Sequence, residues 1–103
     1  MWNKYHGGAT VGQVGSENGT IILDEEHIDG ARITLEQNCR VNIPYAVTAG
    51  IYGIMVHTVF AANKEEAGSM YKEMKLDIER AFDFRNRGDD RELGNWIEVF
   101  CDK

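Results

Sequence analysis

A carboxylate and an imidazole stand two positions apart at Glu25 and His27, within the run Asp24-Glu25-Glu26-His27. On a strand, residues at this spacing share one face, with their side chains about 6–7 Å apart. Such a pair can hold a shared water or ligand and can act in acid–base catalysis, with His57 as a third member. These three residues are the candidates for catalysis. The simpler interpretation, which we adopt, is that Glu25 and His27 rim the core and reach solvent past its edge.

Other patterns of catalytic or metal-binding residues are weak. His6, His27 and His57 lie on separate segments without HxH or HxxxH spacing, so we expect no metal site and no cofactor. Cys39 and Cys101 form no CxxC pair, and we expect both to be reduced thiols. The glycines before residue 20 match neither the dinucleotide-binding nor the Walker phosphate-loop motif.

The turn before the acidic run is predicted at Asn18-Gly19, because both residues tolerate the positive φ of a two-residue type I′ hairpin. This hairpin would pair Glu17 with Thr20. It would also place residue 14, a valine, opposite residue 23, a leucine.

The turn after the acidic run is predicted to be a three-residue loop, Ile28-Asp29-Gly30, with the glycine in a left-handed conformation. This register places Leu23 opposite Leu35, whereas a two-residue loop would place Leu23 opposite a glutamate.

The same register decides which way the acidic residues point. Glu25 and His27 face the apolar side of the meander. Asp24 and Glu26 face the polar side, where we expect Glu26 to form a solvated pair with Arg32.

No residue from 41 to 63 is charged, apart from His57 when it is protonated, and a helix of that length could span a bilayer. Its β-branched residues, glycines and one proline favour strands instead, so we predict a second hairpin that turns over residues 50–53. This turn would align Val47 with Val56. Tyr52, between two glycines at the tip, is the best candidate to contact a partner.

Apolar residues repeat at intervals of three and four from Ala67 to Phe82, which predicts a helix capped by Asn63. Its charged side chains, Lys75 among them, are expected to face water. A short second helix, of one or two turns, is predicted near the C-terminus after a cap at position 89 or 90. The stretch WIEVFC could alternatively form a strand.

The predicted fold is therefore α+β: a single domain, residues 1–103, in which an antiparallel meander plus a hairpin, about five strands, packs on one long helix, with a short C-terminal helix. A single long helix covers only one face of a sheet, so we expect a homodimer to cover the other. The formal charge of −6 disfavours binding to nucleic acid or to an anionic membrane. The opening residues do not resemble a secretory signal, which suggests a cytoplasmic protein.

These features predict a small soluble acidic binding or protein-interaction module without catalytic activity, contacting its ligand or partner through Tyr52, Glu25 and His27. The alternative is a small-molecule enzyme or metal-binding domain that uses Glu25, His27 and His57. A third interpretation is an acidic inhibitor of a basic protein partner, whose binding would fall steeply with salt.

Overall fold

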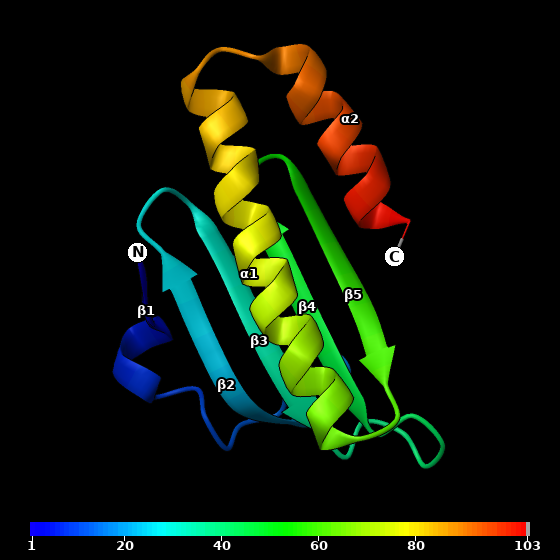
Figure 1. Cartoon of the computed structure of the whole chain (residues 1–103). Coiled ribbons are helices and arrows are strands. Elements are labelled where there is room, and N and C mark those ends of the chain that lie inside the picture. The colour runs from blue at the N-terminus through cyan, green and yellow to red at the C-terminus, as the bar shows by residue number, and fades with distance from the viewer. Residues whose placement is uncertain (103) are drawn as a thin grey trace.

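The computed structural model describes residues 1–102, in which five strands form one antiparallel sheet in the order β1-β2-β3-β4-β5 (Figure 1). Helix α1 crosses one face of this sheet, and α2 packs beside α1. The fold is α+β, as predicted. The elements are β1 (Trp2–Lys4), the 3₁₀ helix η1 (Tyr5–Gly8), β2 (Thr20–His27), β3 (Ala31–Gln37), β4 (Tyr45–Ile51), β5 (Met55–Ala61), α1 (Lys64–Asn86) and α2 (Asp90–Cys101).

The segment before β2 differs from the prediction. Residues 9–19 form a series of turns with one isolated bridge, between Val14 and Thr20, and Val14 is 75 % exposed. The predicted pairings of Glu17 with Thr20 and of Val14 with Leu23 are therefore wrong. The first strand is instead β1, which pairs with the far end of β2.

The buried carboxylate of Glu36 explains this wider loop. Its Oε1 accepts hydrogen bonds from the backbone N–H of Glu17 at 3.2 Å and of Gly19 at 3.1 Å. Gly15 lies directly against the carboxylate, where a Cβ would overlap Glu36 Cδ. A buried carboxylate needs hydrogen-bond donors, and residues 15–19 supply them by wrapping over it.

The turn between β2 and β3 confirms the predicted three-residue loop. Leu23 lies opposite Leu35 and Glu26 lies opposite Arg32. Gly30 has φ 105°, the left-handed conformation that this loop requires. Glu25 and His27 therefore share the face of β2 that packs against α1.

The register between β4 and β5 differs from the prediction by three residues. Val47 lies opposite Val59, not opposite Val56, and the turn is Tyr52-Gly53-Ile54. Gly53 supplies the positive φ of 76°, whereas Gly50 stays inside β4. An odd shift exchanges the two faces of a strand, so Val56 lies on the face away from α1.

The uncharged run from 41 to 63 thus contains two strands, not a bilayer-spanning helix. Among residues 1–102, no helix is both long enough and apolar enough to cross a membrane.

Helix α1 follows the predicted phase. Asn63 caps it by accepting a hydrogen bond from the Glu66 backbone N–H at 2.8 Å. Its buried side chains come from the predicted stripe, but Lys75, expected to face water, is half-buried against the sheet. The buried residues of α1 are Ala67, Tyr71, Met74, Ile78, Ala81 and Phe82.

The C-terminal segment is a helix and not a strand, and its 12 residues exceed the one or two turns predicted. Asp89 caps it by accepting a hydrogen bond from the Glu92 backbone N–H at 3.2 Å. Phe100, 1 % exposed, joins the core between the helices and the sheet. Helix α2 therefore helps to cover the same face as α1.

Candidate functional site

Glu25, one of the predicted site residues, is held between β2 and α1. Its Oε1 accepts hydrogen bonds from the Tyr71 hydroxyl at 2.6 Å and from Lys75 Nζ at 2.9 Å. Burial raises the pKa of Glu25, but the two hydrogen bonds and the charge of Lys75 outweigh it, so this pKa lies below its ordinary value. Burial, followed by the bond to Glu25, raises the pKa of Tyr71. The carboxylate is thus fixed in its charged form.

His27 is 5 % exposed and packs edge-on against Trp2, with its ring centroid 4.8 Å from that of Phe82. Its Nδ1 accepts a hydrogen bond from the Asp29 backbone N–H at 3.0 Å, and its Nε2 lies 2.7 Å from the Met1 amino nitrogen. Burial, followed by the charge of that amino group, lowers the pKa of His27. The imidazole is therefore neutral at pH 7 and packed into the structure.

His57 lies on β5 and does not meet the other two residues. Strands β3 and β4 separate it from β2, a span of about 14 Å at the usual strand spacing. Its ring packs against Phe100 at 5.9 Å, and its Nε2 is buried without a hydrogen-bond partner among the described residues. The structure thus brings Glu25 and His27 to one face and leaves His57 apart.

None of these three residues lines the groove described below or the smaller cavity beside Thr58, Met70 and Met74. Within residues 1–102, no three His, Cys, Asp or Glu side chains are grouped so that they could hold a metal ion. The two cysteines of this part, Cys39 and Cys101, are free thiols.

On the opposite face of the sheet, which was predicted to be polar, Asp24 is buried. Arg32 donates to its Oδ1 from Nε at 3.0 Å and to its Oδ2 from Nη2 at 2.7 Å. The Thr10 hydroxyl donates to Oδ2 at 2.7 Å, and the guanidinium stacks 3.7 Å from the Tyr5 ring centroid. The ion pair of Arg32 is therefore with Asp24, and not with Glu26 as predicted. The folded-back N-terminal segment covers this pair.

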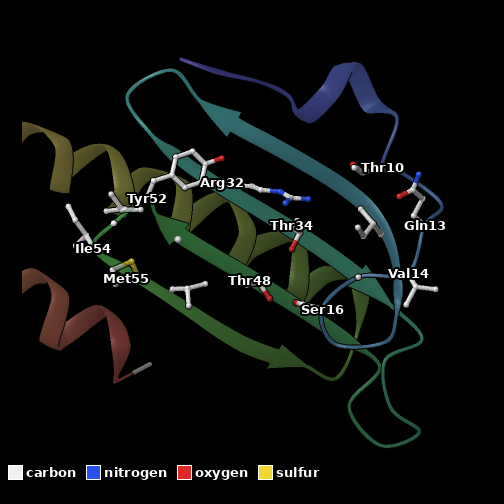
Figure 2. Close-up of a pocket in the computed structure, with 16 residues that line it drawn as sticks. Thr10, Gln13, Val14, Ser16, Arg32, Thr34, Thr48, Tyr52, Ile54 and Met55 are labelled. Atoms are coloured by element: carbon white, nitrogen blue, oxygen red, sulfur yellow. The ribbon is translucent and has the colours of Figure 1, made fainter.

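A groove of about 730 Å³ lies beside this pair on the face away from α1 (Figure 2). Its floor is formed by residues of β3 and β4: Arg32, Thr34, Thr48 and Gly50. One wall is the tip of the β4–β5 hairpin, residues 51–56, and the other is the loop from Thr10 to Ser16. This volume is within the range that small-molecule sites occupy.

Exposed apolar side chains gather around this groove. Figure 2 places Val14 on one wall and Tyr52 and Ile54 on the other, and Val56 also lines the groove. All four are exposed, and Val56 is 70 % exposed. Large apolar side chains concentrated at one concave place on a surface are typical of a binding site.

Tyr52 lies at the hairpin tip, as predicted, and lines the groove. Its hydroxyl donates to Glu26 Oε2 at 2.5 Å. Burial, together with this hydrogen bond, raises the pKa of Tyr52 to about 12. The ring is thereby held against one end of the groove as an uncharged phenol.

Threonines crossing the sheet give the groove floor its polar groups. Thr34 lies opposite Thr48, which lies opposite Thr58, and the Oγ1 atoms of the last two are 2.9 Å apart. The pairing of Thr48 with Thr58 was not predicted because the predicted β4–β5 register was wrong, and no register was predicted between β3 and β4. With the turn placed at residues 52–54, the alignment of Thr48 with Thr58 follows from strand pairing.

The lining of the groove contains hydroxyl groups but no carboxylate, imidazole or thiol. A hydroxyl becomes a nucleophile only beside a base, and none is present among these residues. The arrangement can form hydrogen bonds and bury apolar groups. Comparisons with protein-family models, with curated proteins and with solved structures find no match to this chain.

Proposed function

We propose that this protein is a non-catalytic binding protein and that the groove on the face away from α1 is its binding site. The observation that supports this most is the gathering of Val14, Tyr52, Ile54 and Val56 around a concave surface with a hydroxyl-bearing floor. Burying these apolar side chains would be worth roughly 25 cal/mol for each Å² removed from water. The floor would orient a ligand through hydrogen bonds.

The positions of Glu25 and His27 favour binding over the enzymatic alternative. Glu25 is engaged by Tyr71 and Lys75, and His27 is packed against aromatic rings. A general base needs free access to a substrate proton, and a cavity beside it. Both side chains instead join the sheet to neighbouring segments, and neither lines the groove.

A second copy of the chain and a basic protein are the other occupants to weigh for this surface. The homodimer predicted from the sequence would bury the same exposed apolar side chains around the groove. A basic partner would suit the charge of −6, and its binding would weaken steeply with salt. The concave shape favours a ligand that enters the groove. Placement of the protein in the cytoplasm stays a proposal, supported by its two free thiols.

The uncharged dye Nile red, which emits more strongly in apolar surroundings, tests the groove. We expect saturable emission with the wild-type chain and at least fivefold weaker binding to Val56→Lys, which puts a charge on the wall. Val99→Lys is the matched control, because Val99 is 67 % exposed on α2. Equal binding to both variants would refute the groove as the site.

A further inference from the structure

Charge within the groove is confined to its floor. Arg32 is the one ionisable group among the lining residues apart from the Tyr52 phenol. Figure 2 shows its side chain extending along the floor from the Tyr52 end toward Thr10. The residue that pairs with this guanidinium therefore decides which ligand charge the groove accepts.

Asp24 balances the charge of Arg32. Its carboxylate is fully buried and lies in a two-bond pair with Nε and Nη2 of Arg32, at 3.0 and 2.7 Å. A third hydrogen bond, from Thr10, fixes the same carboxylate. Two opposite charges in such contact present almost no net charge to a ligand a few ångströms away.

We infer that the groove selects an uncharged ligand with an apolar body and a carbonyl or amide group, and that Asp24 sets this selectivity by neutralising Arg32. This inference rests on the proposed function of the groove. The apolar body would pack against the apolar side chains of the groove, such as Val56 and Ile54, which are now exposed to solvent. The carbonyl would accept from Arg32 Nη1, which has no acceptor among the described residues, or from the Thr34 hydroxyl.

The surroundings of the groove oppose an anionic ligand. Glu26 sits behind the Tyr52 hydroxyl at one end, outside the lining, and the chain as a whole carries a charge of −6. A cationic ligand would meet the N–H groups of Arg32 on the floor, which donate hydrogen bonds and offer no acceptor for a cation. Both ions would also lose water on entering an apolar rim, which a neutral amide loses at lower cost.

Three probes that share an eight-carbon chain distinguish neutral, anionic and cationic ligands at pH 7.5: octanamide, octanoate and octylammonium. Backbone amide shifts of the wild-type protein would locate and titrate each probe. We expect octanamide to shift the amides of Thr34, Thr48 and Val56 in a saturable way, at least tenfold more tightly than either ion. Its affinity should be unchanged between 50 and 300 mM salt.

Substitution of Asp24 tests whether this residue sets the selectivity for an uncharged ligand. In Asp24→Asn the guanidinium is left uncompensated, so octanoate should bind at least tenfold more tightly than it does to the wild type. The double variant Asp24→Asn/Arg32→Met removes both charges, so the gain in octanoate affinity seen in Asp24→Asn should disappear. The wild-type titrations decide the ligand class even if a variant does not fold.

The outcomes distinguish the two proposals. If no probe shifts the groove residues, the proposed function itself fails. If octanoate or octylammonium binds in the groove as tightly as octanamide, the groove stands and the inferred selectivity is overturned. If Asp24→Asn folds but gains no affinity for octanoate, Asp24 does not set the selectivity.

Discussion

Among individual residues, Glu25 has a definite effect on how stability depends on pH. Its folded-state pKa is lowered, while the ordinary value is 4.5, so its contribution is complete above pH 4.5 and is lost as the pH falls through the folded pKa. We expect Glu25→Gln to reduce the free energy of unfolding by about 1–2 kcal/mol at pH 7. This deficit should shrink below pH 4.5.

Urea unfolding from pH 7 to pH 3 measures this effect. Glu98→Gln is the matched control, because Glu98 is exposed on α2. A deficit of constant size across this range would show that the contacts from Tyr71 and Lys75 do not depend on the charge of Glu25.

The direction of Glu25 and His27 could be predicted from the sequence, whereas the burial of Asp24 could not. Alternation along a strand, once the Gly30 loop fixed the register, placed Glu25 and His27 on the α1 face. Asp24 is bound by Thr10, which lies in a turn, and by Arg32, on which Tyr5 of the 3₁₀ helix stacks. Hydrophobic periodicity does not describe such a segment, so the cover over Asp24 left no signal.

At the scale of elements, the phase of α1 can be tested with one buried and one exposed position. Met74→Asp would bury an unpaired charge, and we expect it to cost about 3 kcal/mol or more. Lys72→Asp, on the exposed side of the same turn, should change stability by less than about 0.5 kcal/mol. Lys75 is unsuitable as the control because it binds Glu25. Comparable melting shifts for the two variants would contradict the observed phase.

The attachment of α2 depends on Phe100. Phe100→Ala would open a cavity in the core, and we expect it to reduce the free energy of unfolding by about 3–5 kcal/mol. Val99→Ala, at an exposed neighbour, should change it by less than about 0.5 kcal/mol. Chemical denaturation followed by tryptophan fluorescence compares the two. A small effect of Phe100→Ala would mean that α2 is dispensable.

Helices were easier to predict than the second hairpin for a physical reason. The capping residues Asn63 and Asp89 and the three-and-four spacing each mark a helix independently. In residues 45–61, both faces of the hairpin are apolar, so the pattern does not choose a register. Gly50 and Gly53 offered competing turns, and only the second has a positive φ.

At the scale of the whole molecule, the structure changes the premise of the predicted homodimer. That prediction assumed that the short C-terminal segment could cover the second face of the sheet only in part. Tyr5 and Thr10 cover the β2–β3 part of this face, and the loop over Glu36 closes its end. The groove lies on the part of this face that these segments leave open.

The mass in solution therefore tests whether the groove is free. A second copy would bring a further charge of −6, which opposes association. If the groove is a site for an uncharged ligand, light scattering over a dilution series should give a constant mass near 11.6 kDa. A mass that doubles on concentration, and that returns to 11.6 kDa in Val56→Lys but not in Val99→Lys, would assign the groove to a second copy. Octanamide would then compete with self-association, because both would bury Val56.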